Sequence, residues 1–280
     1  MAVVKTDDGV DISYRVLGTG PCTLLFMHGW AGAGAYFDET LKYLDLTGLR
    51  AITFDLRGHG DSDKPATSYS DERFARDAFT VADAVGANQI VVIGFSMSGR
   101  FAQYLSVLAP DRVHGQILVT GCPAAPIPFP EDLRRDWVGR AGNAERLKEI
   151  TAMYTTKPVA TAVLDLIGAE AAKAREVALD ETLRICMYES FVQKIVMRDL
   201  ATLIIGGIHD PIFPPDALRF GVAAPFPKAR IAFLDSNHEV PIEQPREFAA
   251  LIEAFVAGLP KGDADSSPVP SAISNNAPTQ

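Results

Sequence analysis

The chain has 280 residues, of which 48% are hydrophobic and 22% are charged, and its formal net charge is -9. This size and apolar content suit one soluble globular domain with a sizeable core. The sequence has no run of Lys and Arg, and no apolar stretch near the roughly 20 residues of a membrane helix, so we expect neither a nucleic-acid nor a membrane partner. Its first residues lack the apolar core of a signal peptide, which favours a cytoplasmic protein.

Predicted strands and helices alternate along most of the chain. Apolar, β-branched stretches bounded by turn residues predict strands at 3–5, 10–17, 22–27, 50–55, 90–93, 113–120, 201–206 and 230–234. Helical spacing predicts helices over about 35–46, 71–85, 100–109 and 245–256, and another that begins near Pro215. This order predicts an α/β fold with a mostly parallel, doubly wound sheet that helices cover on both faces.

One long segment interrupts this alternation. Residues 123–199 contain no clear buried strand, begin with a cluster of prolines and then show the pattern of several helices. The segment is too long for a loop and follows the strand that ends near Thr120, so we expect a helical cap over the carboxyl ends of the strands, where ligands bind in such folds. The core then comprises 1–122 and 200–259. The tail 260–280, rich in Pro, Ser, Asn and Ala, is expected to be disordered.

The sequence Gly-Phe-Ser-Met-Ser-Gly at 94–99 lies between a buried strand and a helix. A chain that passes from strand to helix within so few residues turns sharply, which is typical of a nucleophile elbow that lifts one hydroxyl above the sheet. Ser96 lies at the apex. Ser98 stands where the usual pattern has a second Gly, and because serine is small we expect Ser98→Gly to be tolerated. Taken alone, the segment also fits an ordinary strand–loop–helix junction.

A serine hydroxyl becomes a nucleophile when a base takes its proton and an acid orients that base. Among the five histidines, His238 lies in a loop after a late strand, from which it can reach Ser96. Asp210 follows the preceding strand and is the expected acid. Asp235 is only the second candidate for the acid, because it lies too close to His238 along the chain. In isolation, His238 would be interpreted as a solvated loop histidine and Asp210 as the start of an Asp-Pro turn.

Acyl transfer also needs hydrogen-bond donors aimed at the developing oxyanion. The backbone N–H of Met97, at the start of the predicted helix, is one candidate. The second is the backbone N–H of Trp30, in a Gly-containing loop after an early strand. His28, beside it, is interpreted as a structural hydrogen-bonding residue. Arg57 and His59, in the Gly-rich loop after the next strand, are interpreted as structural residues that brace the site.

The cysteines have no metal-binding or redox spacing in the sequence; they are Cys22, Cys122 and Cys186. Cys22 and Cys122 lie at or beside predicted strands and are interpreted as small buried hydrophobic residues. We therefore expect no metal site, and the chemistry of a serine nucleophile requires no cofactor.

Five short motifs follow one another in a fixed order: His28-Gly29-Trp30, Asp55-Leu-Arg-Gly-His-Gly-Asp-Ser62, Gly94-Phe-Ser-Met-Ser98, Gly207-x-x-Asp210-x-x-x-Pro214, and Asn237-His238 with Glu243-x-Pro245. Through these motifs, residues 3–258 resemble the α/β-hydrolase superfamily, in the subgroup with a helical cap. The resemblance implies an α/β-hydrolase fold and a nucleophile, acid and histidine in that order along the chain. The chain departs from the pattern at Ser98 and at Asn237, where a Gly is common.

The resemblance extends to esterases, lactonases, C–C bond hydrolases and cofactor-free haloperoxidases alike. Haloalkane dehalogenases and epoxide hydrolases resemble this fold too, but they have an aspartate at the apex, so Ser96 argues against them. The leading hypothesis is a serine hydrolase that cleaves a small, largely apolar ester or lactone through an acyl-enzyme. One alternative is a C–C bond hydrolase, perhydrolase or haloperoxidase with the same triad. Another is a non-catalytic receptor that uses the pocket to hold a ligand.

An apolar substrate requires an apolar pocket around the triad. Core residues beside the catalytic positions and aromatic residues of the cap are the candidates to line it: Trp30, Phe95, Ile212, Val240, Trp137, Tyr154, Tyr188 and Phe191. Packing between helices is the alternative role for each cap residue. The sequence leaves a homodimer open.

Overall fold

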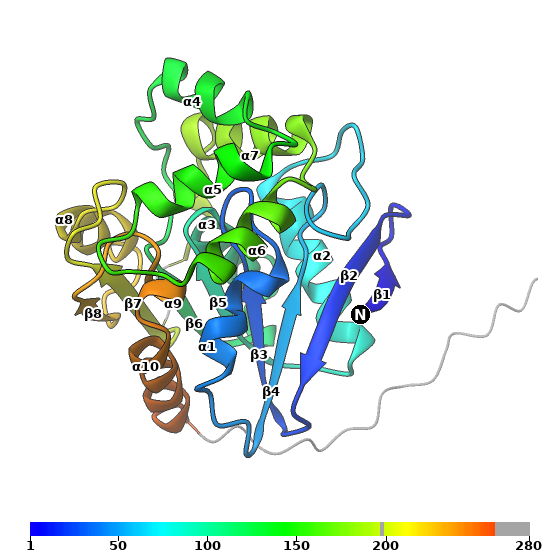
Figure 1. Cartoon of the computed structure of the whole chain (residues 1–280). Coiled ribbons are helices and arrows are strands. Elements are labelled where there is room, and N and C mark those ends of the chain that lie inside the picture. The colour runs from blue at the N-terminus through cyan, green and yellow to red at the C-terminus, as the bar shows by residue number, and fades with distance from the viewer. Residues whose placement is uncertain (197–198, 261–280) are drawn as a thin grey trace, which may run out of the picture.

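A computed structural model describes residues 1–196 and 199–260 (Figure 1). The predicted disordered tail, 260–280, lies outside the described residues except for Pro260. The described chain forms one eight-stranded sheet in the order β1-β2-β4-β3-β5-β6-β7-β8. The strands are β1 (Ala2–Lys5), β2 (Asp11–Leu17), β3 (Cys22–Met27), β4 (Leu49–Phe54), β5 (Ile90–Phe95), β6 (Val113–Val119), β7 (Thr202–Gly207) and β8 (Arg230–Leu234).

The sheet is mostly parallel, as predicted. Only β1–β2 and β2–β4 pair antiparallel among the described strands, and β4, β3, β5, β6, β7 and β8 run parallel to one another. Every predicted strand lies within two residues of an observed one. Because these strands are parallel, their carboxyl ends meet at one edge of the sheet, where an α/β fold places its ligand.

Helices cover both faces of this sheet. The helical elements are η1 (Gly34–Phe37), α1 (Asp38–Leu41), α2 (Asp71–Ala84), α3 (Met97–Leu108), η2 (Pro110–Arg112), α4 (Glu131–Val138), α5 (Ala144–Met153), α6 (Thr161–Ala171), α7 (Glu176–Tyr188), η3 (Val192–Lys194), α8 (Pro215–Ala217), η4 (Leu218–Val222), α9 (Val240–Glu243) and α10 (Pro245–Ala257). None of the described helices combines the length and the apolar composition needed to cross a membrane.

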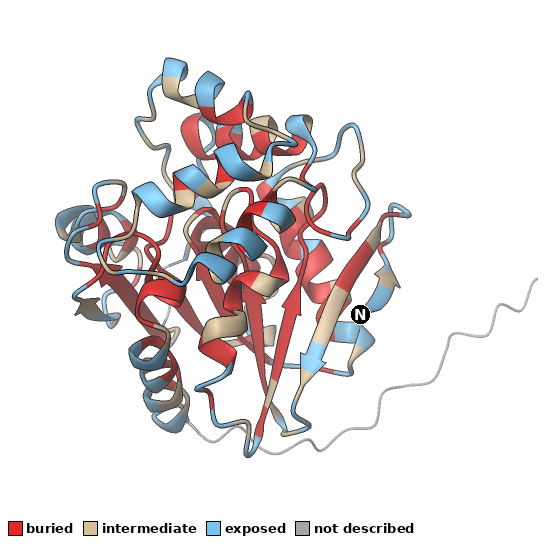
Figure 2. Cartoon of the chain, viewed as in Figure 1, coloured by how far each residue is buried: buried red, intermediate tan, exposed pale blue. Residues whose placement is uncertain are grey.

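Strand β5 shows how the two faces are built. Its side chains alternate, so Ile90 and Val92 join the core beneath α2 and α3, whereas Val91 and Ile93 join the core beneath α10. All six residues of the strand are buried, and Figure 2 shows the same burial along the central strands. Burial on both faces explains why this stretch is a continuous apolar run in the sequence.

Two predicted helices differ from the observed ones. The prediction over 35–46 becomes the short 3-10 helix η1 followed by the single turn α1, and the chain then turns where the N–H of Thr47 donates to Asp45 Oδ1. Such an Asx turn competes with helix over the last predicted residues, 45–46. The helix near Pro215 is also short and continues as the π-helical turn η4.

The segment 123–199 contributes α4, α5, α6 and α7, which lie over the carboxyl ends of the strands (Figure 1). These helices share a small apolar core of their own, in which Trp137, Leu147, Ile150 and Leu179 are buried. Ala31, from the loop after β3, belongs to the same core. The described part of the segment is therefore packed onto the strand ends.

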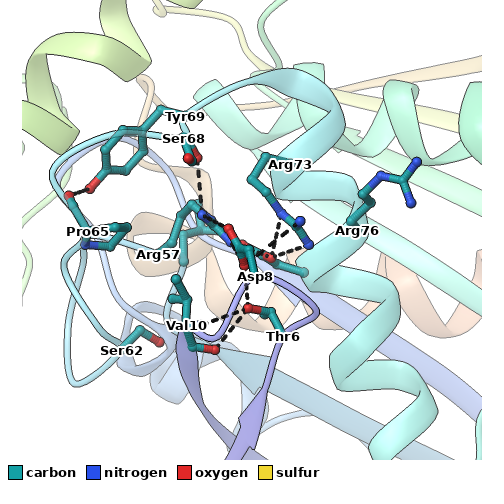
Figure 3. Close-up of polar contacts among 12 residues, drawn as sticks. Thr6, Asp8, Val10, Arg57, Ser62, Pro65, Ser68, Tyr69, Arg73 and Arg76 are labelled. Carbon is teal, nitrogen blue, oxygen red and sulfur yellow. Dashed lines mark hydrogen bonds and ion pairs between the residues drawn. The ribbon is translucent and has the colours of Figure 1, made fainter.

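A buried ion network holds the loop after β4. Arg57 is fully buried, its Nε donates to Asp77 on α2 at 2.6 Å, and its Nη1 donates to Asp8 at 3.0 Å and to the carbonyl oxygen of Ser68 at 3.1 Å. Arg73 joins the same carboxylates from α2 (Figure 3). These contacts place Arg57 in the framework that ties the turn between β1 and β2 to α2.

Candidate active site

Ser96 lies at a strained turn between β5 and α3. Its backbone has φ 52° and ψ −119°, and non-glycine residues rarely adopt a positive φ. Two backbone hydrogen bonds of 2.9 Å hold the turn, because the N–H of Ser96 donates to Val119 and the N–H of Cys122 donates to Ser96. The sharp turn that the sequence predicts is therefore present.

Two glycines make this turn possible. A Cβ on Gly94 would lie 2.3 Å from the carbonyl oxygen of Ser98, and a Cβ on Gly99 would lie 2.5 Å from Cα of Gly121. Gly99 thus allows the start of α3 to approach the backbone beyond β6. Ser98 itself is fully buried, and its hydroxyl donates a hydrogen bond to the carbonyl oxygen of His28.

His238 and Asp210 complete a hydrogen-bonded chain that begins at Ser96. The Nε2 atom of His238 lies 2.8 Å from Oγ of Ser96, and the Nδ1 atom of His238 lies 2.8 Å from Oδ2 of Asp210. Asp210 follows β7 and His238 follows β8, which are neighbouring parallel strands, so both loops lie at the same sheet edge as the elbow. The structure brings the three predicted catalytic residues together.

The second oxygen of Asp210 is held by the backbone. Its Oδ1 accepts hydrogen bonds from the N–H groups of Ile212 at 2.8 Å and Phe213 at 3.1 Å. Asp235, the alternative acid, is instead exposed on the surface, where it pairs with His209 and Lys157. The geometry therefore distinguishes the two candidate acids in favour of Asp210.

Burial and charge act in opposite directions on the triad. Burial alone would lower the pKa of His238, but the Asp210 carboxylate raises that pKa above its ordinary value of 6.5. Burial alone would raise the pKa of Asp210, but His238 and the two backbone N–H groups hold it below its ordinary value. Asp210 is therefore ionised near neutral pH and stabilises the imidazolium form of His238.

Trp30 and Met97, whose backbone N–H groups are the expected oxyanion donors, line the same cavity as Ser96. Among the described residues, neither group has a hydrogen-bond acceptor, because Trp30 lies in the loop after β3 and Met97 is the first residue of α3. Helix starts leave such donors free. The indole N–H of Trp30 donates to Leu179 on α7 at 2.9 Å, which fixes the side chain of Trp30 and leaves its backbone donor available.

His28 and His59 are buried neutral histidines beneath this loop. Burial lowers the pKa of His28 to about 4 and that of His59 to about 3. The Nδ1 of His28 lies 2.8 Å from the carbonyl oxygen of Gly29, and its Nε2 lies 3.0 Å from the N–H of Leu56, so this nitrogen accepts. Their partners are backbone groups, which agrees with the structural role expected for both.

An apolar cavity opens beside Ser96 and leaves about 80 Å³ for the centres of water-sized molecules. Five predicted pocket residues line it: Trp30, Phe95, Ile212, Trp137 and Tyr154. The rings of Trp30, Trp137 and Tyr154 form a continuous wall that leads to the ring of His238. The centroid distances are 5.2 Å from Trp30 to Trp137, 5.9 Å from Trp137 to Tyr154 and 6.3 Å from Tyr154 to His238. Core and helical segment therefore both contribute to the cavity.

Three predicted pocket residues lie elsewhere. Val240 is completely buried in the core beneath α10. Tyr188, at the end of α7, is 55% exposed and its hydroxyl donates to Glu131. Phe191 is buried against Tyr104, with its ring centroid 4.9 Å away, and lines a separate cavity between α2, α3 and α7. The aromatic character of these residues did not indicate which face of each element they occupy.

Several cavity residues were missed from the sequence. The chemically important ones are Tyr36, Cys122, Cys186 and Glu239, of which Glu239 directly follows His238. Cys122 and Cys186 are buried free thiols, and burial raises the pKa of Cys122. The adjacency of Glu239 to His238 was the one available signal for Glu239. Tyr36 offered none, because it lies far from the triad along the chain.

Glu243 links the His238 loop to the helical segment. Its Oε1 accepts the N–H groups of Thr156 at 3.0 Å and Lys157 at 2.8 Å, and its Oε2 accepts the N–H of Asn237 at 3.0 Å and the hydroxyl of Ser236 at 3.1 Å. The hydroxyl of Thr156 donates to the same carboxylate. One buried carboxylate therefore fixes the chain between α5 and α6 relative to the loop that carries the histidine.

The described residues contain no group of three or more His, Cys, Asp or Glu side chains that could hold a metal ion. The groups that converge at the strand ends are a hydroxyl, an imidazole, a carboxylate and free backbone donors. This set can activate a serine and stabilise an oxyanion.

Comparison with known proteins supports this description. A family model described as the alpha/beta hydrolase fold matches residues 23–156. The chain is 33% identical over 125 residues to a non-heme chloroperoxidase from Streptomyces lividans, covering 44% of this chain and 45% of that protein. It is 34% identical over 132 residues to epoxide hydrolase 3 from Siraitia grosvenorii, covering 45% of this chain and 42% of that protein. The matches thus span less than half the length of these relatives.

The fold extends beyond the matched stretch. The structure superimposes on an esterase from Exiguobacterium antarcticum with a TM-score of 0.83 and 20% sequence identity, covering 92% of this chain and 99% of the other. The likeness therefore includes the helical segment and the strands β7 and β8, which precede Asp210 and His238.

Proposed function

We propose that this chain, which belongs to the α/β-hydrolase superfamily, is a serine hydrolase that cleaves small, largely apolar carboxylic esters or lactones. The observation that carries the proposal is the continuous hydrogen-bonded chain from Ser96 through His238 to Asp210. It starts at a strained backbone position and faces an apolar cavity. Strain at that position is the kind of cost that persists at functional sites.

The geometry supports a two-step mechanism. His238 Nε2 takes the proton from Ser96 Oγ as that oxygen attacks the substrate carbonyl carbon. The backbone N–H groups of Trp30 and Met97 stabilise the oxyanion that forms. His238 then donates the proton to the leaving alkoxide, the carbon–oxygen bond breaks, and an acyl ester on Ser96 results.

Water completes the cycle by the same route in reverse. His238 takes a proton from a water molecule, whose oxygen attacks the acyl carbon, and returns it to Ser96 Oγ as the acid leaves. Asp210 stays ionised throughout and stabilises the imidazolium formed in each step. The aromatic wall excludes bulk water around the reacting atoms, which strengthens these electrostatic interactions.

The lining of the cavity supports an apolar substrate. Trp137 and Tyr154 come from the helical segment, while Trp30, Phe95 and Ile212 come from the core, so an acyl chain would lie between the two. We propose that the segment 123–199 acts as a cap that selects acyl length. The hydrogen bonds of Glu243 to Thr156 and Asn237 would hold that cap in a fixed position relative to the His238 loop.

A second candidate reaction is peracid formation with the same triad, in which hydrogen peroxide replaces water in the second step and the acyl group leaves Ser96 as a peracid. The peracid can then transfer an oxygen atom to a halide ion, which is oxidised while the peracid is reduced to the carboxylic acid. The likeness to a non-heme chloroperoxidase favours this candidate. The aspartate expected of an epoxide hydrolase is absent from the apex, where Ser96 stands, which argues against that activity despite the likeness to an epoxide hydrolase.

A screen of p-nitrophenyl esters of increasing acyl length, beside a small panel of lactones, tests the proposal. The wild-type protein should turn over short or medium esters many times, and Ser96→Ala should lose roughly 10⁶-fold in kcat. A single burst of one equivalent without turnover would indicate a receptor that is acylated once. Retention of more than a few per cent of the activity by Ser96→Ala would overturn the role of Ser96.

A further inference from the structure

The cavity beside Ser96 has one polar corner that the proposed mechanism does not use. Glu239, immediately before α9, and Tyr36, in η1, both line the cavity and are only 7% and 6% exposed. The hydroxyl of Tyr36 donates a hydrogen bond to Oε2 of Glu239. The two residues are far apart in the sequence, so the fold alone creates this pair.

The other oxygen of Glu239, Oε1, has no hydrogen-bond partner among the described residues. Both carboxylate oxygens of Asp210 and of Glu243, by contrast, accept hydrogen bonds. Oε1 is not one of the fully enclosed unpaired polar atoms of the described residues, and Glu239 lines the cavity. A largely buried carboxyl group is stabilised by a hydrogen bond, which a ligand in the cavity can supply. Burial also raises the pKa of Glu239 to about 7.

The corner shares a wall with the reacting atoms. The ring of Tyr36 stacks on Phe95 with a centroid distance of 4.8 Å, and Phe95 lies 5.5 Å from the ring of His238. Phe95 directly precedes Ser96, and Glu239 directly follows His238. Glu239 and Ser96 therefore line one cavity, and a substrate in that cavity can contact both.

We infer that Glu239 anchors a polar subsite that accepts a hydrogen bond from a hydroxyl group of the substrate, so that the preferred ester carries a hydroxyl near its scissile bond. This inference rests on the proposed ester hydrolysis. A neutral hydroxyl suits the site better than an ammonium group. One unpaired acceptor satisfies the single O–H of an alcohol, whereas two N–H donors of an ammonium would stay unpaired against the apolar wall.

The test compares substrates that differ by one hydroxyl. The pairs are p-nitrophenyl butyrate against its 2-hydroxy and 3-hydroxy derivatives, and ethyl butyrate against 2-hydroxyethyl butyrate, each corrected for uncatalysed hydrolysis. In the wild-type protein, at least one hydroxylated ester should exceed its partner in kcat/KM by about tenfold or more, because a site built for a hydrogen bond discriminates against a substrate that lacks it.

Variants separate recognition from mere structure. The double variant Tyr36→Phe/Glu239→Leu removes the acceptor without leaving the tyrosine hydroxyl unpaired, and it should bring the ratio close to one. Glu239→Gln retains a carbonyl acceptor and should recover part of the preference. The double variant is replaced if circular dichroism and thermal melting show that it does not fold. In that case, kcat/KM for the hydroxylated ester relative to its partner is measured in Glu239→Gln and in Glu239→Leu.

The outcomes are distinguishable. Wild-type hydrolysis of butyrate esters with no preference for any hydroxylated partner would overturn the subsite and leave the serine hydrolase intact. A preference that persists unchanged in Glu239→Leu would also overturn it. Absence of Ser96-dependent turnover on all esters would contradict the proposed function itself.

Discussion

The buried hydroxyl of Ser98 donates a hydrogen bond to the backbone carbonyl oxygen of His28, which joins the start of α3 to the loop after β3. These two segments carry the two proposed oxyanion donors, since Met97 precedes Ser98 and Trp30 follows His28 by two residues. The departure from the usual glycine therefore has a physical function. Ser98 links the two segments that carry the proposed oxyanion donors.

This relationship changes the expectation for Ser98→Gly. Without the hydroxyl, the carbonyl of His28 loses its buried donor and the loop that holds Trp30 is less well fixed. We expect kcat to fall about tenfold, which corresponds to about 1.4 kcal/mol, with a smaller change in KM. Ser106→Ala is the control, because that buried hydroxyl donates to Gln103 on the same helix and away from the cavity. Equal kcat values for Ser98→Gly and wild type would contradict this role of Ser98 and would agree with the tolerance that the sequence predicts.

Asp210→Asn should leave the fold intact and slow the reaction strongly. An amide cannot stabilise the imidazolium of His238 and favours the wrong tautomer, so a loss of about 10⁴-fold in kcat is expected. Asp235→Asn is the matched control, because that carboxylate lies on the surface. Steady-state assays on a short ester measure both. A slow Asp235→Asn beside a nearly normal Asp210→Asn would mean that the acid is Asp235.

The pH dependence of kcat/KM follows from His238. The base must be neutral to accept the proton of Ser96, and Asp210 raises the pKa of His238 above 6.5. Activity should therefore fall as the pH decreases, with a midpoint above pH 6.5. Burial raises the pKa of the adjacent Glu239 to about 7, so this group titrates in the same pH range. The variant Glu239→Gln removes that titration, and the fall in kcat/KM that remains at low pH then belongs to the histidine. A limb centred well below pH 6.5 in both proteins would contradict this assignment.

Arg57→Met should reduce stability by roughly 3–5 kcal/mol, because it leaves the buried Asp77 carboxylate without its main partner. The double variant Arg57→Met/Asp77→Leu should recover much of that loss. Arg76→Met on the exposed side of α2 is the control and should change the free energy of unfolding by less than about 1 kcal/mol. Denaturant unfolding measures all three. A small effect of Arg57→Met would show that the network in Figure 3 does not hold the loop.

The proposed cap makes a further prediction about acyl length. Trp137 lines the cavity, so Trp137→Ala should enlarge it and raise kcat/KM for long esters relative to short ones. Tyr188→Ala removes another large aromatic residue of the same segment, but from an exposed position, and serves as the control with an unchanged ratio. If both variants fold and both keep the wild-type ratio, the segment does not select acyl length through Trp137.

The central strands and the triad could be predicted because their signals are local. A buried parallel strand such as β5 is a continuous apolar run, and the elbow and Asp210 each come soon after such a run. His238 comes soon after β8, which is only partly buried. Once strands and their order are known, the carboxyl ends define a shared edge, and that edge brings residues from distant loops together.

The lining of the cavity was predicted only in part, because it depends on which way each helix of the inserted segment faces. Trp137 and Tyr188 are both aromatic residues of that segment, yet one points into the cavity and the other to solvent. The pairing of Tyr36 with Glu239 depends on tertiary packing between η1 and the loop before α9. Residue type and spacing along the chain carry no information on such contacts.

Trapping of the acyl-enzyme tests the central claim most directly. The protein is mixed with a slowly hydrolysed p-nitrophenyl ester, quenched in acid within the burst, digested and analysed by mass spectrometry. If Ser96 is the nucleophile, one acyl group per chain is expected on Ser96, with none in Ser96→Ala and with release of the acid on longer incubation. A wild-type protein that releases p-nitrophenol over many turnovers while Ser96 stays unmodified, or that carries the acyl group on another residue, would contradict this claim.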